Sequence, residues 1–295
     1  MLTTEQLLIR RKTIGASESS AALGLSKYKT PVAVYLEKIG MSEMREDSEA
    51  MYWGREFEEP IARRYSAETG KEVISCEPVI SEKYSFMSCN LDRKIVGENA
   101  AVECKNVGFF SDDWGQPGTD QIPTDYLIQI AHQAIVCDLD YVALAALGNR
   151  YNFRVYRYER NEKLEKSIIS GLHKFWHENV LKEIAPEPKT CEDLGYLFKD
   201  EGTSIEASSD IQSLVQQYNE KKEEKKLAED AETAIKVQIA AFMGSASILT
   251  LNGDKLATYK AQESTRIDSA KLKELMPEIY EEYSKTSSFR VFRSK

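Results

Sequence analysis

Apolar and polar residues alternate with two different spacings in the first 185 residues of the chain, one typical of strands and one typical of helices. The run Ala-Val-Glu-Cys-Lys at 101–105 is strand-like, so its side chains should point alternately to the two faces of a sheet. The stretch 54–69 has an amphipathic helical pattern and ends before Gly70, a residue suited to a C-terminal cap. Another helix begins at Pro123. The sequence therefore predicts a mixed α/β core.

A proline tract divides the chain. The segment Ala-Pro-Glu-Pro at 185–188 marks a boundary, because proline cannot continue a helix. Residues 190–208, which follow it, are polar and predict a loop. We therefore expect a core domain over residues 1–188 and a separate C-terminal extension over residues 209–295.

The extension begins with a predicted helix and hairpin. Apolar residues fall on stripes of a long helix over 209–243, on either side of the charged block 220–226. Two short apolar runs flank Asn252-Gly253, a dipeptide typical of a tight hairpin turn. The extension thus predicts helical and β-hairpin structure.

The end of the chain predicts one more helix and one more strand. Asp268 can cap a helix over 269–280, which Pro277 can interrupt. Residues 289–293 alternate like a final strand.

The composition is that of a folded protein with no membrane segment. Hydrophobic residues make up 42% of the 295 positions, enough for a core, and no apolar run is long enough to span a bilayer. The N-terminus lacks the basic, apolar and small-residue regions of a signal peptide. We therefore expect a cytoplasmic location and no membrane partner.

The cysteines and the net charge narrow the choice of function. The five cysteines are scattered, without a C-x2-C metal pair or a disulfide framework, and are expected as free thiols. The formal charge of −9 argues against indiscriminate coating of nucleic acid. It does not exclude a nuclease, because local basic patches bind phosphates whatever the net charge of the protein.

Asp92, Glu103 and Lys105 follow the sequence pattern of a metal-dependent nuclease centre. Glu103 and Lys105 share one face of their strand, and Asp92 arrives from the preceding strand. Two carboxylates could hold a hard divalent cation, which prefers oxygen ligands and keeps several waters. Such a cation stabilises charge on a scissile phosphate and helps to generate hydroxide. Taken alone, the pattern equally fits an exposed strand with alternating charges.

A third carboxylate could come from the helix over 54–69. Glu58 or Glu59 on this helix could lean over the same metal. A surface acidic cluster would have the same pattern, so the helix alone does not decide the question.

Polar residues also line one side of the helix that begins at Pro123. Tyr126, Gln129 and Gln133 share this side by their spacing. Buried polar groups need partners, and a metal-bound water or a phosphate would supply one. His132 fits a packed histidine better than a ligand, because hard cations favour oxygen donors, and the part that Gln133 plays stays open.

The N-terminal region has the pattern of a phosphate-binding site. Arg10 and Ser17 precede a short helix over 19–23, and free amides at a helix start favour anions. Lys27 and Lys29 add two further cations. An ordinary capped helix with surface cations would show the same pattern.

Five of these segments, in this order, resemble the motifs of the YqaJ-type viral recombinases, the phage relatives of lambda exonuclease. The resemblance covers residues 8 to about 180 and touches the C-terminal extension. The segments are IGASE with LGLSKYKTP (14–31), YWGREFEEPIARRYSAETGK (52–71), MSCNLDR (87–93), VECKNVG (102–108) and IPTDYLIQIAHQ (122–133).

This resemblance implies a restriction-endonuclease-like fold, with a mixed central sheet flanked by helices and two Mg²⁺ ions, for which Mn²⁺ could substitute. It implies 5′→3′ digestion of one strand of linear double-stranded DNA, without ATP, for homologous recombination. It also implies a ring-shaped trimer and a single-strand annealing protein as partner. The gene would belong to a phage or prophage and the protein would act in the bacterial cytoplasm.

The resemblance also assigns roles at the metal centre. Asp92 and Glu103 match the metal ligands, together with the backbone carbonyl of Cys104. Lys105 matches the residue that orients or activates the attacking water. Glu58 matches the helix carboxylate by its spacing from the flanking glycines, and is preferred to Glu59.

Further roles concern a catalytic glutamine and the DNA end. Gln129 matches the glutamine of the third motif, and Arg10 with Ser17 matches the pair that grips the terminal 5′-phosphate. The chain departs from the family at Arg93, where glycine is usual, and at Cys104, where a small or branched residue is usual. Neither change removes a catalytic group, but Arg93 could alter how the strand enters.

Two other functions remain compatible with the sequence. One is a structure-specific or CRISPR-associated endonuclease of the same superfamily, although the clustered cysteines of its iron–sulfur members are missing. The other is a DNA-end-binding protein without activity, against which the intact Asp92, Glu103 and Lys105 argue.

Overall fold

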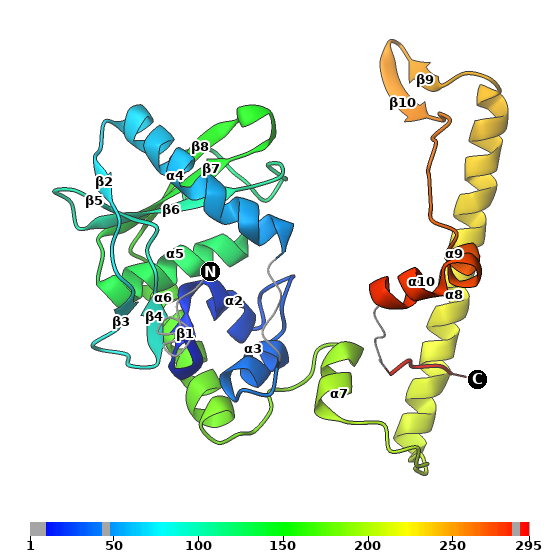
Figure 1. Ribbon diagram of the computed structural model, residues 1–295, viewed down its shortest axis with the longest axis horizontal. Coiled ribbons are helices and arrows are strands. Elements are labelled where there is room, and N and C mark those ends of the chain that lie inside the picture. The colour runs from blue at the N-terminus through cyan, green and yellow to red at the C-terminus, as the bar shows by residue number, and fades with distance from the viewer. Residues whose placement is uncertain (1–9, 43–47, 285–289, 295) are drawn as a thin grey trace. The chain divides into compact units, whose positions relative to one another are not determined.

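The computed structural model describes residues 10–42, 48–284 and 290–294. The chain divides into two compact units, Met1–Phe198 and Lys199–Lys295 (Figure 1). The first unit therefore extends past the proline tract at 185–188 and includes one more helix.

A five-stranded mixed sheet forms the centre of the first unit. Its strand order is β2-β5-β6-β7-β8, in which β6 and β7 run parallel and the other neighbours run antiparallel. A smaller sheet has the order β1-β4-β3. The strands are β1 (Ile14–Gly15), β2 (Val73–Ile74), β3 (Val79–Ile80), β4 (Met87–Cys89), β5 (Arg93–Ile95), β6 (Ala100–Asn106), β7 (Tyr141–Leu147) and β8 (Phe153–Glu159).

Helices cover both faces of the five-stranded sheet. On one face α4 packs against β6 and β7, and on the other α5 packs against β7 and β8, with α6 packed against α5 (Figure 1). The helical segments are η1 (Ala16–Glu18), α2 (Ser19–Ala22), α3 (Pro31–Lys38), α4 (Glu49–Thr69), α5 (Thr124–Cys137), η2 (Asn149–Tyr151), α6 (Glu162–Lys174), η3 (Phe175–Val180) and α7 (Cys191–Leu197).

The two cores explain why β7 is apolar along its length. Val142 and Leu144 of β7 belong to the core under α5, whereas Ala143 and Ala145 belong to the core under α4. A strand buried on both faces loses the usual alternation of apolar and polar residues. The predicted mixed α/β class is confirmed, and the mixed central sheet flanked by helices that the resemblance implied is present.

The ends of α4 follow from its capping residues. The helix begins at Glu49, before the predicted start at residue 54, because the Ser48 hydroxyl accepts the backbone N–H of Met51 at 3.3 Å. It ends at Gly70, whose φ of 71° confirms the predicted glycine cap.

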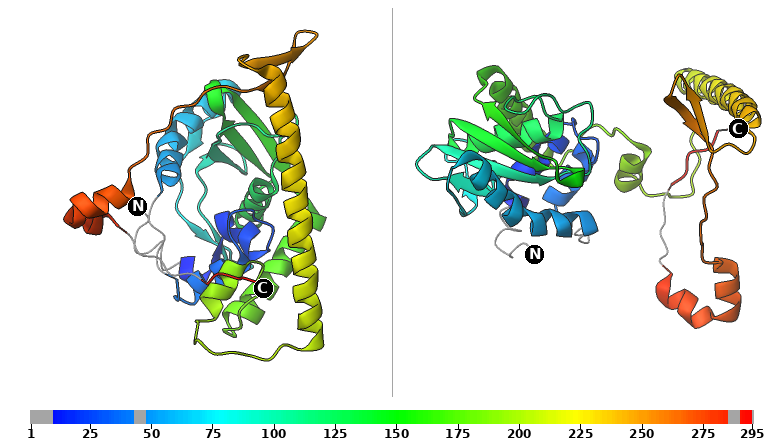
Figure 2. Two further views of the ribbon diagram at one scale, coloured as in Figure 1. Left: turned by 90° about the vertical axis from the view of Figure 1, so that its right-hand side faces the viewer. Right: turned by 90° about the horizontal axis from the view of Figure 1, so that it is seen from above.

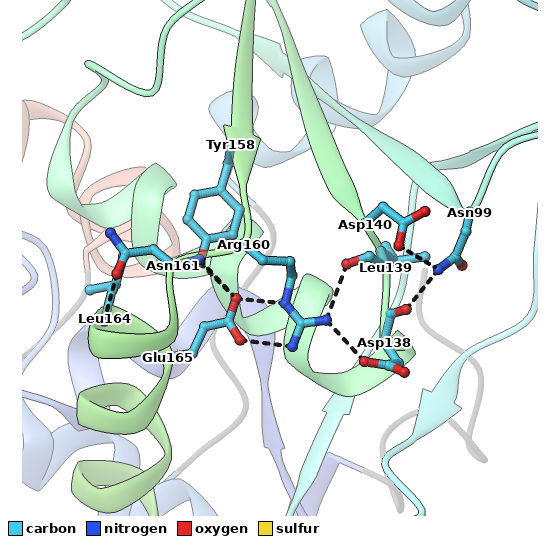
Figure 3. A network of polar contacts seen from close by, with 9 residues as sticks. All are labelled: Asn99, Asp138, Leu139, Asp140, Tyr158, Arg160, Asn161, Leu164 and Glu165. Carbon is cyan, nitrogen blue, oxygen red and sulfur yellow. Dashed lines mark hydrogen bonds and ion pairs between the residues drawn. The ribbon is translucent and has the colours of Figure 1, made fainter.

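Arg160 holds the end of α5 beside the start of α6 (Figure 3). Its Nε and Nη2 donate to the two carboxylate oxygens of Glu165, both at 2.7 Å. Its Nη1 donates to Asp138 Oδ1 at 2.9 Å and to the carbonyl oxygen of Leu139 at 3.2 Å. Tyr158 also donates its hydroxyl to Glu165, at 3.0 Å. These bonds fix the C-terminal end of α5, the helix that carries the predicted glutamines.

The second unit consists of a long helix, a hairpin and two short helices (Figure 2). They are α8 (Ser209–Met243), β9 (Ile248–Leu251), β10 (Asp254–Thr258), α9 (Ser269–Leu275) and α10 (Pro277–Tyr283). The predicted long helix is confirmed, as is the hairpin, because Asn252 and Gly253 both adopt the positive φ that its turn requires. The predicted helix after Asp268 is also confirmed, with its break at Pro277. In the part of the chain that the structure describes, no helix combines the length and apolar character needed to cross a membrane.

Two predictions of secondary structure are wrong. Residues 190–208 are not a continuous loop, because Thr190 and Asp193 form a capping box that starts α7. Residues 290–294 form no strand, and Phe289 lies outside the described residues. Phe292 instead packs edge-on against Tyr218 of α8, with ring centroids 5.1 Å apart.

Candidate active site

The central strands bring Asp92, Glu103 and Lys105 together. Asp92 directly precedes β5, which pairs with β6. The backbone N–H of Cys104 donates to Asp92 Oδ2 at 2.7 Å, so the partner strand holds the carboxyl in place. Lys105 Nζ lies 2.5 Å from Glu103 Oε1, as expected for two side chains on one face, whereas Cys104 packs in the opposite core.

Two amides from α5 hold the Glu103 carboxylate, which is buried. Gln129 Nε2 donates to Glu103 Oε1 at 2.5 Å, and Gln133 Nε2 donates to Glu103 Oε2 at 2.6 Å. The sequence left the role of Gln133 open, although its spacing of one helical turn from Gln129 was the available signal. With Lys105, these amides give Glu103 donors on both oxygens.

His132, on the same helix, points away from the centre into the core. It is fully buried, and its Nε2 lies 3.0 Å from the carbonyl oxygen of Ser88. Burial lowers the pKa of His132 to about 4. The prediction that His132 is a packed histidine is confirmed.

The two carboxyls of the centre repel each other. Burial raises the pKa of Asp92 well above its ordinary value, and the charge of Glu103 raises it further. Burial alone would lower the pKa of Lys105, but the charges of Glu103 and Asp92 outweigh it and raise that pKa. One ammonium faces two carboxyls, so the site carries an excess of negative charge whenever both carboxyls are ionised.

The donor set fits a hard divalent cation. Asp92 and Glu103 offer carboxylate oxygens, and such cations complete their coordination with water. Gln133 Oε1 is a buried oxygen that has no hydrogen-bond partner within the described residues, and a metal-bound water could donate to it. The excess negative charge would be neutralised by the cation. Asp92 and Glu103 could thus hold Mg²⁺ beside Lys105.

Glu58 and Glu59 approach the centre from α4 but are bound to Arg93. Arg93 donates to Glu58 Oε1 at 2.5 Å and to Glu59 Oε2 at 2.7 Å, and also to the backbone carbonyl of Asp92. For this reason Glu58 does not join Asp92 and Glu103. Among the residues that the structure describes, no three acidic, histidine or cysteine side chains gather as a metal-binding group.

The predicted phosphate-binding residues lie next to each other. Arg10 Nη2 donates to Ser17 Oγ at 3.3 Å, and both residues line a cavity of about 50 Å³ that also contacts Gln129. Because Gln129 binds Glu103, this cavity adjoins the acidic centre. The neighbouring hydroxyls are used within the fold, since Ser19 donates to Ala16 O and Ser20 to Asp125.

A larger pocket, of about 440 Å³, lies close to Lys105. Asn106, the next residue along β6, lines it, and so does Tyr126, whose ring centroid is 5.7 Å from Lys105 Nζ. The segment between β6 and α5 contributes Phe109 and Trp114 to the wall. This segment therefore borders the site.

Comparison with known proteins identifies the family. Residues 5–140 match the YqaJ-like viral recombinase domain. Over 308 aligned residues the chain is 31% identical to the protein YqaJ of Bacillus subtilis (strain 168), with 100% of this chain and 95% of that protein covered. The chain belongs to the YqaJ-like viral recombinase family. This confirms the resemblance drawn from the motifs.

Solved structures also resemble this chain. The alkaline exonuclease LHK-Exo of Laribacter hongkongensis is 21% identical, with a TM-score of 0.49, over 62% of this chain and 94% of that one. A phage-related exonuclease of Haemophilus somnus 129PT is 14% identical, with a TM-score of 0.43, over 58% of this chain and 96% of that one.

The repulsion at the centre predicts that Asp92→Asn stabilises the protein when metal is withheld. Because its folded-state pKa is raised, Asp92 supports the fold fully only below its unfolded pKa of about 3.9, and this support is lost as pH rises through the folded-state pKa. In EDTA, Asp92→Asn should melt a few degrees above wild type at pH 8, and the difference should shrink towards pH 4. Asp112→Asn, at an exposed carboxylate, is the control. Equal melting of Asp92→Asn and wild type at pH 8 would contradict the proposed repulsion.

Proposed function

We propose that this recombinase is a Mg²⁺-dependent exonuclease that digests one strand of linear double-stranded DNA in the 5′→3′ direction. The observation that carries the proposal is the pairing of half-buried Asp92, held by the Cys104 N–H, with buried Glu103, which contacts Lys105 and two side-chain amides. Two buried like charges are costly unless something compensates them, which suits a site that works with a cation.

The residues divide the work of phosphodiester hydrolysis. Asp92, Glu103 and the backbone carbonyl of Cys104 would hold the metal, and Gln129 with Gln133 keeps Glu103 in its orientation. Two bound Mg²⁺ ions, or Mn²⁺ in their place, would supply an activated water and neutralise charge on the leaving oxygen. Because the charges of Glu103 and Asp92 raise the pKa of Lys105, its ammonium keeps its proton at neutral pH and places a positive charge beside the phosphate.

The two cavities beside the centre suggest how the DNA lies. The small cavity at Arg10 and Ser17 would hold the terminal 5′-phosphate, where a guanidinium and a hydroxyl can donate to it. The larger pocket would receive unpaired nucleotides of the same strand. Tyr28 and Phe109 line that pocket and are 82% and 67% exposed, so their rings are free to stack on bases.

Assembly would involve the second unit and further copies of the chain. The protein would assemble as a ring-shaped homotrimer. A single-strand annealing protein would receive the exposed strand for recombination. The long helix α8 supports a role in association, because Ile211, Leu214 and Ile235 are each half exposed or more. The core at residues 1–188 would carry the nuclease and residues 209–295 the contacts.

Digestion of defined duplexes tests the activity. The wild type should degrade linear duplex with Mg²⁺ and not with EDTA, and should leave closed circular duplex intact. Lys105→Ala should reduce the rate by about 10²-fold or more while the protein stays folded, because one donor at a developing charge is worth that much. Cleavage of the circle would instead favour an endonuclease, and DNA-end binding without cleavage would favour an inactive binder.

The small cavity predicts a preference for phosphorylated ends. A 5′-phosphorylated duplex should be digested faster than one with a 5′-hydroxyl, and Arg10→Ala should remove much of this preference. The loss of one charge-assisted hydrogen bond is worth about 1.5–3 kcal/mol, which corresponds to about a ten- to hundredfold change in rate. Arg11→Ala, at the next exposed arginine, is the matched control. Equal rates on both ends would remove the phosphate assignment and leave the nuclease proposal standing.

A further inference from the structure

Arg93 lies between α4 and the acidic centre. Its guanidinium makes three contacts, with Glu58, Glu59 and the backbone carbonyl of Asp92. The arginine is buried on β5, so its position is fixed by the sheet. The two glutamates come from a helix surface, where the Glu58 side chain is 34% exposed and that of Glu59 is 61% exposed.

Glu58 is close enough to act on the centre. The Nη1 atom of Arg93 donates both to Glu58 Oε1 and to the backbone carbonyl of Asp92, which places the Glu58 carboxylate beside a residue expected to hold the metal. The Glu58 carboxylate itself is held by Arg93 at 2.5 Å. The helix carboxylate that could serve the metal is therefore present at the centre, but its charge is already paired.

We propose that Arg93 competes with the divalent cation for the Glu58 carboxylate and thereby sets how tightly the centre binds metal. This rests on the proposed metal-dependent function. In the protein without metal, Arg93 holds Glu58. When a cation binds, the partly exposed Glu58 side chain turns from the guanidinium to the cation or to a water bound to it. Arg93 is thus a positioning residue.

Glu59 makes this exchange feasible. A buried guanidinium that lost its carboxylate partner would be left with an uncompensated charge, which is strongly unfavourable. Arg93 would keep Glu59 and the Asp92 carbonyl after Glu58 has left. A planar guanidinium can hold two carboxylates on different nitrogens, which a lysine cannot do with the same geometry.

Calorimetric titration of Mg²⁺ and of Mn²⁺ into the metal-free, full-length protein tests the competition. Arg93→Gln should bind both ions about fivefold or more tightly than wild type, a typical size for coupling between two binding events. The same Arg93→Gln change in a Glu58→Gln background should have much less effect, because the contested carboxylate is gone. Lys94→Gln removes the same charge from the next residue, whose side chain is exposed, and should leave the affinity near wild type.

The variants separate competition from simple electrostatics and from misfolding. Arg93→Lys retains the positive charge but not the planar guanidinium, and should bind metal with intermediate affinity. If Arg93→Gln does not fold, Arg93→Lys provides the test. Equal tightening in Lys94→Gln, or an undiminished effect of Arg93→Gln in the Glu58→Gln background, would overturn the proposal. Metal binding that is lost in Asp92→Ala but unchanged in Arg93→Gln would overturn this proposal alone. No Asp92-dependent binding in wild type would overturn both this proposal and the proposed function.

Discussion

Like charges repel most strongly where water is excluded, and the carboxyls of Asp92 and Glu103 are held in such a place. Burial, and after it the charge of Glu103, raises the pKa of Asp92. Lys105 offsets part of the repulsion, and the remaining negative charge makes a divalent cation the natural partner. The site is therefore a compromise in which folding stability is given up for a charge arrangement that a metal can use.

The rest of the first unit keeps this arrangement rigid. The pairing of β5 with β6 lets the Cys104 N–H hold Asp92, and it places Glu103 and Lys105 on one face. Helix α5, which crosses from β6 to the parallel β7, supplies the two amides that hold Glu103. Arg160 in turn fixes the end of α5 against α6 (Figure 3). Together these contacts restrict the movements that would separate the two carboxyls.

Local patterns in the sequence predicted much of this fold and of the candidate site. Strand alternation placed Glu103 and Lys105 on one face, and the motif order identified the family and the mixed α/β fold. The contacts of Arg93 could not be predicted in the same way, because they depend on how α4 crosses the sheet. The short helix α7 was missed although its Thr190 capping box was visible. The predicted strand over 289–293 is wrong because Phe292 packs against α8 and the described residues 290–294 do not join a sheet.

The central claim is that Asp92 and Glu103 together bind a divalent cation. Crystals of the full-length protein grown with Mn²⁺, with diffraction measured at the manganese absorption edge, test it directly. The account predicts an anomalous peak within coordination distance of both carboxylates and beside Lys105. Manganese bound only elsewhere, with Asp92 and Glu103 still contacting nothing but protein, would contradict it.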